Sequence, residues 1–199
     1  MKTAGIVLCG GHSSRMGRPK AWLPFGDELM LSRIVRILRE AVNPVVVVAA
    51  ADQSLPPLPP DVLVVRDAVA DRGPLQGLAA GLAALDGLAD AAYLSSCDVP
   101  FLKPAFVRRV LELLGNSRIA IPLSSGFYHP LAAAYRLDVL QVVRELLAAN
   151  RLKPRLLLET VAARIVEPHE LTDVDPDLAS LRNMNTPDDY AAALRTLAE

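Results

Sequence analysis

A chain of 199 residues with 52% hydrophobic residues can bury a sizeable core, and its length fits a single domain over residues 1–199. The net charge is −1, with 21 basic and 22 acidic residues closely mixed, which excludes an overall attraction to nucleic acid or to an anionic membrane. The sequence has no apolar run of the roughly 18 residues that a membrane span needs, no signal-peptide pattern and only two cysteines, so we expect a cytoplasmic protein.

Short apolar runs alternate with segments of helical periodicity through the first 114 residues. The runs are typical of strands buried on both faces of a parallel sheet, and they cover residues 3–8, 45–49, 62–65 and 91–95. The helical segments cover residues 30–42, 73–85 and 104–114. This alternation predicts a three-layer α/β/α sandwich with a Rossmann-like, mostly parallel sheet, and ligands outside the carboxyl ends of its strands.

The pattern is less regular beyond residue 126. We expect an added, antiparallel strand within 129–135, helices over 138–150 and 153–161, and an extended segment over 164–167. Four prolines within residues 54–60 predict a stiff surface loop between two strands, although a linker or a polyproline ligand would have similar composition.

The C-terminal helix has the clearest start signal. Thr186 fits the N-cap, Pro187 the first helical position, and Asp188 and Asp189 the positive end of the helix dipole. The helix is predicted to run toward residue 197.

A glycine-rich segment, LCGGHSSRMGRPK at residues 8–20, directly follows the first predicted strand. The pair Gly10 and Gly11 lets backbone N–H groups approach an anion, and Arg15, Arg18 and Lys20 add positive charge. The spacing is neither the GxGxxG of dinucleotide-binding folds nor the GxxxxGK[ST] of P-loop enzymes. From these residues alone, a tight turn with solvent-facing basic side chains remains an alternative to a phosphate site.

Asp98, in the string CDVP, follows the fourth predicted strand and should lie at the same sheet edge as the glycine loop. Mg²⁺ is often bound through one or two protein carboxylates together with substrate phosphates, so Asp98 is a candidate metal ligand. The alternative is an ordinary cap of the helix that begins near Lys103.

Three further segments carry candidate residues. Asp67 ends the third predicted strand, and GPLQG at residues 73–77 opens a helix. His129 begins an HPL string, and Asn183 and Asn185 belong to NMNTPDD. Taken alone, these residues could equally be loop, strand and helix-cap positions.

Together these segments resemble the molybdenum cofactor guanylyltransferase family over nearly the whole chain. Residues 10–20 match the family signature GGxSxRMGxxK, and CDVP, GPLQG and NMNTPDD match further family elements. Two departures are visible. Cys9 stands where many relatives have Ala. Residues 49–52 read AAAD where the family often has Asn, so we expect that no side chain there makes the contact of that Asn.

The resemblance implies transfer of GMP from Mg·GTP to the phosphate of molybdopterin, giving molybdopterin guanine dinucleotide and pyrophosphate. Residues 1–100 would form the nucleotide half and 101–199 the pterin half. The resemblance implies catalytic roles for Lys20, Asp98 and Arg15, and it implies that Asp98 also binds the Mg²⁺. The implied nucleotide-binding residues are Leu8, Cys9, Gly10, Gly11, Ser13, Lys20, Asp67, Gly73, Pro74, Gly77 and Asp98, and the implied pterin-binding residues are His129, Asn183 and Asn185.

Several alternatives remain open from the sequence. A cytidylyltransferase for the same pterin or a sugar-phosphate nucleotidyltransferase would share the architecture, and a non-catalytic GTP- or GDP-binding regulator or interaction domain could keep the loop. Other cofactor-biosynthesis or acceptor proteins are possible partners. Cys9 and Cys97 both follow predicted strands, and packing is the preferred account of them, with a redox switch as the alternative.

Overall fold

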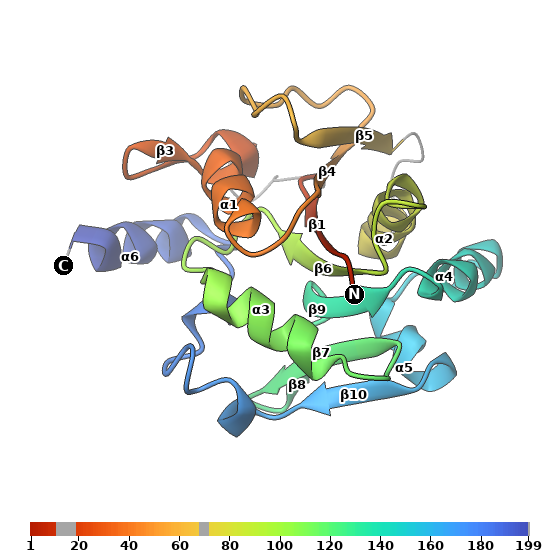
Figure 1. Ribbon diagram of the computed structural model, residues 1–199. Coiled ribbons are helices and arrows are strands. Elements are labelled where there is room, and N and C mark those ends of the chain that lie inside the picture. The colour runs from red at the N-terminus through yellow and green to blue at the C-terminus, as the bar shows by residue number, and fades with distance from the viewer. Residues whose placement is uncertain (11–18, 68–71, 199) are drawn as a thin grey trace.

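A mostly parallel sheet lies between two layers of helices in the computed structural model, which describes residues 1–10, 19–67 and 72–198 (Figure 1). The strand order is β10-β7-β9-β6-β1-β4-β5, and β8 pairs with β7. The strands are β1 (Thr3–Leu8), β4 (Val45–Ala50), β5 (Leu63–Asp67), β6 (Ala91–Ser96), β7 (Ile119–Ser124), β8 (Phe127–Tyr128), β9 (Ala132–Arg136) and β10 (Ala163–Val166). A separate hairpin joins β2 (Pro24–Phe25) to β3 (Glu28–Leu29).

The two faces of the sheet carry separate apolar cores, because alternate residues of each strand point to opposite faces. On one face pack α1 (Met30–Arg39), α3 (Pro104–Leu113) and α6 (Pro187–Ala198). On the other pack α2 (Gly73–Ala84), α4 (Val139–Ala148) and α5 (Leu157–Thr160). The 3₁₀ turns are η1 (Lys20–Trp22), η2 (Pro154–Leu156), η3 (Pro168–Glu170) and η4 (Ala179–Leu181). The predicted three-layer sandwich is therefore confirmed.

The antiparallel strand is confirmed as β9, which pairs antiparallel with both β6 and β7. The predicted helical segment over 153–161 is confirmed, although it consists of the 3₁₀ turn η2 followed by the single turn of α5. The third strand is not buried on both faces: β5 is an edge strand, and Leu63 and Val64 are exposed. Strand β7 was not predicted, because Pro122 interrupts its apolar run and a proline within such a run argues against a strand.

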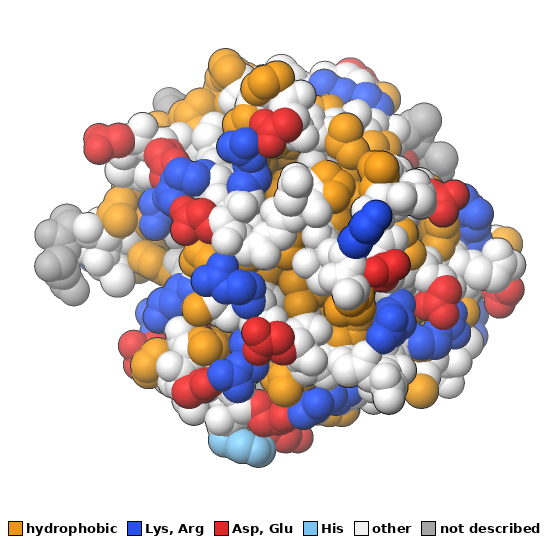
Figure 2. All heavy atoms as spheres, in the orientation of Figure 1, with side chains coloured by type: hydrophobic (Ala, Val, Ile, Leu, Met, Phe, Trp, Pro, Cys, Tyr) orange, Lys and Arg blue, Asp and Glu red, His pale blue; other side chains and the backbone are white. Residues whose placement is uncertain are grey.

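The predicted proline-rich loop is confirmed between β4 and β5, where Leu55 and Leu58 pack against the core. On the face shown in Figure 2, basic and acidic side chains are interspersed, as the balanced composition leads one to expect. Among the described helices, none combines the length and the apolar character required to cross a membrane.

Helix α2 approaches β1 closely because two glycines face that strand. A Cβ atom on Gly81 would lie 2.6 Å from Cγ2 of the buried Ile6, and one on Gly77 would lie 3.0 Å from Cδ2 of Leu8. The first approach leaves no room for a methyl group, whereas the end of the Leu8 side chain can shift. These glycines therefore set the distance between the helix and the sheet.

We expect Gly81→Ala to lower the free energy of unfolding by about 1–3 kcal/mol, because overpacking outweighs the gain in helix propensity of about 1 kcal/mol. Gly77→Ala should cost less, and it serves as the matched control. Urea denaturation of both variants checks the order. A Gly81→Ala variant as stable as the wild type would contradict the close packing of α2 on β1.

Candidate active site

The candidate site lies at the carboxyl edge of the central strands. β1 runs parallel to both β4 and β6, with Leu8 level with Val48 and Ser96, so the segments after these strands emerge side by side. The backbone continues this pairing beyond the strands, since Cys97 N donates to Leu8 O over 3.1 Å. Gly10 and Asp98 are thereby brought to the same edge.

Asp98 is the centre of a polar cluster and is only 7% exposed. Its Oδ2 lies 2.5 Å from Nζ of Lys20, and its Oδ1 accepts hydrogen bonds from Ser96 Oγ at 2.5 Å and Asn183 Nδ2 at 3.2 Å. Lys20 Nζ also donates to Asn185 Oδ1 over 3.2 Å. The structure thus joins the predicted nucleotide loop, the predicted metal ligand and two of the predicted pterin residues in one cluster.

Lys20 is held in place by the turn that carries it. It begins η1, where Leu23 N donates to Lys20 O over 3.2 Å, and the neighbouring Ala21 is buried. Trp22 anchors the same turn through Nε1, which donates to Ser54 O over 3.1 Å. Three other predicted site residues, Gly11, Ser13 and Arg15, lie outside the described residues.

The C-terminal asparagines are positioned by the segment that precedes α6. Met184 is buried, and its N–H donates to Asp98 O over 2.9 Å. The predicted N-cap is confirmed: Thr186 Oγ1 accepts from Asp189 N at 3.1 Å, while Asp189 Oδ2 accepts from the N–H groups of Asn185 and Thr186 at 2.9 Å each. These hydrogen bonds, led by that from Asn185, lower the pKa of Asp189. The cap therefore fixes Asn185 beside Lys20.

Three supporting side chains carry no signal strong enough to predict them from the sequence. Ser96 fixes one oxygen of Asp98, and Arg33 donates from Nε to Pro100 O over 2.8 Å, behind the Asp98 turn. Gln53 Nε2 donates to Cys9 O over 2.9 Å. Gln53, one residue past the AAAD string, thus reaches back from the segment after β4 to Cys9.

Cys9 and Cys97 lie side by side at the ends of β1 and β6, and both are buried free thiols. A hydrogen bond with Cys97 lowers the pKa of Cys9, while the same contact and burial raise the pKa of Cys97. Gln53 Nε2 also lies 3.5 Å from Cys9 Sγ. The pair therefore packs between the ends of the two strands, next to Gly10 and Asp98 in the chain.

The remaining nucleotide candidates border the same edge. Asp67 ends β5, and Gly73 and Pro74 are exposed at the start of α2. Gly73 has a φ of +67°, which strains any other residue. Gly77, in contrast, is buried against the side chain of Leu8, so its observed contact is a packing contact.

His129 stands apart from the Asp98 cluster. It lines a pocket of about 410 Å³, together with Phe127 from β8 and Asp177 and Arg182 from the segment before α6. Burial lowers the pKa of His129, and a hydrogen bond to the backbone of Ser124 opposes that effect. The predicted pterin residues are thus divided between a pocket, with His129, and the cluster, with Asn183 and Asn185.

The pH dependence of stability tests the burial of His129. Its pKa in the unfolded chain is near 6.5 and its pKa in the fold is lower, so protonation favours unfolding. The contribution of neutral His129 to the free energy of unfolding is fully present above pH 6.5, and it is lost as the pH falls through the folded-state pKa. We expect the Tm of His129→Gln to fall less than the Tm of the wild type between pH 7.5 and pH 5. His169 is exposed, so the Tm of His169→Gln should fall as much as that of the wild type. Identical curves for His129→Gln and wild type would contradict this.

Asp98 is also the best-placed candidate for a metal ligand in the described part of the chain. That part contains no cluster of three or more His, Cys, Asp or Glu side chains. A single carboxylate nonetheless fits Mg²⁺, which commonly binds one or two protein carboxylates together with substrate phosphates and water. Ser96 and Asn183 fix Oδ1 of Asp98, while Oδ2 contacts only the ammonium of Lys20 among the described residues, so Oδ2 is the oxygen that could also face a cation.

The family is decided by a match that spans most of the sheet. Residues 5–165 match the MobA-like NTP transferase domain. The chain belongs to this family. It is therefore a nucleotidyltransferase, and the resemblance predicted from the sequence is confirmed.

Relatives of this MobA-like chain match over its whole length. A Mycobacterium avium (strain 104) protein named "Probable molybdenum cofactor guanylyltransferase" is 34% identical, covering 100% of this chain and 96% of that protein. The fold is similar to molybdopterin-guanine dinucleotide biosynthesis protein A from Archaeoglobus fulgidus, with a TM-score of 0.79, 20% identity and 98% of each chain covered. It is also similar to Rv0371c from Mycobacterium tuberculosis H37Rv in complex with manganese, with a TM-score of 0.64, 22% identity, and 98% of this chain and 100% of that chain covered.

Proposed function

We propose that this nucleotidyltransferase transfers GMP from Mg·GTP to the terminal phosphate of molybdopterin. The products are molybdopterin guanine dinucleotide and pyrophosphate. The observation that carries the proposal is the contact of Lys20 with Asp98 at the sheet edge where the glycine loop begins. The names of the full-length relatives supply the guanine base and the molybdenum cofactor.

The nucleotide is proposed to lie along the edge formed by the ends of β6, β1, β4 and β5. In this arrangement the triphosphate meets backbone N–H groups of the glycine loop and the ammonium of Lys20. The guanine base lies toward the start of α2, where Gly73 and Pro74 are exposed. The proposed contacts are Leu8, Cys9, Gly10, Gly11, Ser13, Lys20, Asp67, Gly73, Pro74, Gly77 and Asp98, with Arg15 as a further phosphate ligand.

The reaction requires two anions to meet. An oxygen of the acceptor phosphate attacks the α-phosphorus of GTP, and the bond from that phosphorus to the departing pyrophosphate breaks. The nucleophile is already ionised, so this chain needs no general base and acts by orienting the reactants and neutralising charge. Lys20 and Arg15 stabilise the leaving pyrophosphate, while Asn183 and Asn185, beside Asp98 and Lys20, orient the attacking phosphate.

Asp98 is the proposed ligand of the Mg²⁺. When bound, the ion would neutralise charge on the phosphate oxygens of the donor nucleotide. Ser96 and Asn183 hold the carboxylate in one orientation for this role. The manganese complex of the related Mycobacterium tuberculosis fold supports a divalent cation in this architecture.

Incubation of the protein with molybdopterin and each Mg·NTP in turn, followed by product identification by mass, tests the proposal. We expect molybdopterin guanine dinucleotide and pyrophosphate with GTP. A cytidine dinucleotide would instead assign the chain to the cytidylyltransferases. Nucleotide binding without any product would favour a non-catalytic regulator.

A further inference from the structure

The pocket beside His129 lies at the same sheet edge as Asp98. Strands β6 and β7 run in the same direction, because both pair antiparallel with β9. Tyr135 of β9 is level with Ala92 on one side and Ile119 on the other, and counting along both strands places Ser124 level with Cys97. Two strand spacings separate the ends of β6 and β7, which is about 10 Å.

One wall of the pocket is the hairpin that joins β7 to β8. Ser124 pairs with Phe127 across a two-residue turn, and both turn residues have positive φ, +50° at Ser125 and +79° at Gly126. Positive φ at both central residues is typical of the tight type I′ turn, which fixes the direction of the following residue. Phe127 lines the pocket and is 73% exposed as a residue.

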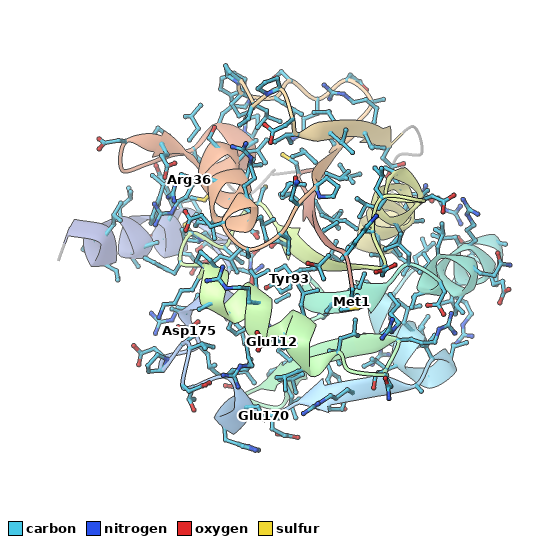
Figure 3. The ribbon with its side chains drawn as sticks, in the orientation of Figure 1. Met1, Arg36, Tyr93, Glu112, Glu170 and Asp175 are labelled. Atoms are coloured by element: carbon cyan, nitrogen blue, oxygen red, sulfur yellow. The ribbon has the colours of Figure 1, made fainter. Side chains whose placement is uncertain are left out.

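The opposite wall is the segment from Asp175 to Arg182. The buried side chain of Asp175, which lies beside α3 in Figure 3, accepts from Ser180 N at 2.8 Å and lies 2.8 Å from Nζ of Lys103. Leu178 lines the pocket with φ +48° and ψ +36°, an unfavourable conformation for a bulky residue. Residues held in strained conformations are concentrated at ligand clamps. This wall is therefore anchored and strained at the point where it faces the pocket.

The chemistry of the pocket is that of a site for a polar aromatic ring. Phe127 offers an exposed aromatic face, and His129 and Asp177 offer polar groups near it. Within the described part of the chain, neither Asp177 nor Arg182 has an ion-pair partner. Arg182 leads directly to Asn183, which donates to Asp98, so the pocket and the cluster share one segment of chain.

We propose that this pocket holds the heterocyclic end of the acceptor, with Phe127 stacked on the pterin ring and the Asp177 carboxylate bound to its aminopyrimidine edge. The inference rests on the proposed function. An aminopyrimidinone presents an N–H and an adjacent amino group, and the two oxygens of a carboxylate accept from both. The separation of about 10 Å lets one molecule place its phosphate at Asp98 and its ring in the pocket.

Steady-state transfer assays with molybdopterin and Mg·GTP test this arrangement. We expect Phe127→Ala and Asp177→Asn each to raise the KM for molybdopterin about tenfold, with the KM for GTP and the Tm unchanged. The matched controls are Tyr128→Ala, the neighbouring partly exposed aromatic outside the pocket, and Asp86→Asn, beyond the end of α2. Both controls should keep the wild-type KM for molybdopterin.

The ring is tested separately with 6-hydroxymethylpterin, which lacks the phosphate. It should inhibit the wild type competitively against molybdopterin but not against GTP. The proposal would be overturned by a KM for molybdopterin within twofold of wild type in both pocket variants, or by an equal rise in Tyr128→Ala. A wild type that forms no dinucleotide would instead remove the proposed function, and the two failures are thus distinguishable.

Discussion

Asp98→Asn is expected to lower the kcat of nucleotidyl transfer by roughly 10²–10³-fold while the Tm stays close to that of the wild type. Asparagine keeps the shape of the side chain, and its carbonyl oxygen can still accept from Ser96. The substitution removes the negative charge that a bound cation requires. The same charge pairs with Nζ of Lys20, which lies 2.5 Å from Oδ2 of Asp98. The chemical step should therefore suffer far more than the fold.

The measurement is a titration of Mg²⁺ at saturating GTP, followed by pyrophosphate release. The matched control is Asp90→Asn, just before the opposite end of β6, where the carboxylate accepts from Lys2 N at 2.7 Å far from the candidate site. The control should keep the wild-type kcat and Mg²⁺ dependence. Near-normal turnover in Asp98→Asn at saturating Mg·GTP would remove this carboxylate from the mechanism.

The sequence was sufficient to predict that the candidate residues share one sheet edge, because its strongest signals follow strands directly. Gly10 comes two residues after β1 and Asp98 two residues after β6, so a parallel sheet brings them to one edge. Tyr93, near the middle of β6 in Figure 3, is fully buried, as expected for a strand with neighbours on both sides. Local periodicity and the direction of the strands were enough for this step.

The contacts that orient the site could not be predicted in the same way. Asn183 reaches Asp98 across 85 positions of sequence, and Arg33 reaches the turn after Asp98 from α1. Such contacts depend on how helices pack on the sheet, and nothing in local composition encodes them. Gln53 left a weak signal, as a polar residue just after an alanine run. The roles of Gly11, Ser13 and Arg15 remain predictions from the sequence pattern.

The burial of individual strands depended on the strand order, which the apolar runs do not determine. The runs at β4 and β5 look alike in sequence, yet β4 lies between two neighbours and β5 has only one. The exposed Val64 follows from that position. Strand β7 illustrates the opposite error. Pro122 argues against a strand in the sequence, yet the strand forms and pairs with its neighbours.

Lys20→Gln is expected to lower kcat roughly 10²–10³-fold and to raise the KM for GTP, because in the proposed mechanism a single ammonium serves both the bound triphosphate and the leaving pyrophosphate. Lys20→Arg should restore part of the affinity but less of the kcat, since the charge returns on a larger, planar group that cannot take the position between Asp98 and Asn185. Steady-state kinetics with varied GTP separates the two effects.

Lys153→Gln is the matched control, an exposed lysine before η2 on the far side of the sheet from α1, and it should leave both constants unchanged. If both Lys20 variants transferred GMP at the wild-type rate, the contact with Asp98 would serve only to hold η1 against the sheet. The phosphate charge would then have to be neutralised by other residues of the glycine loop.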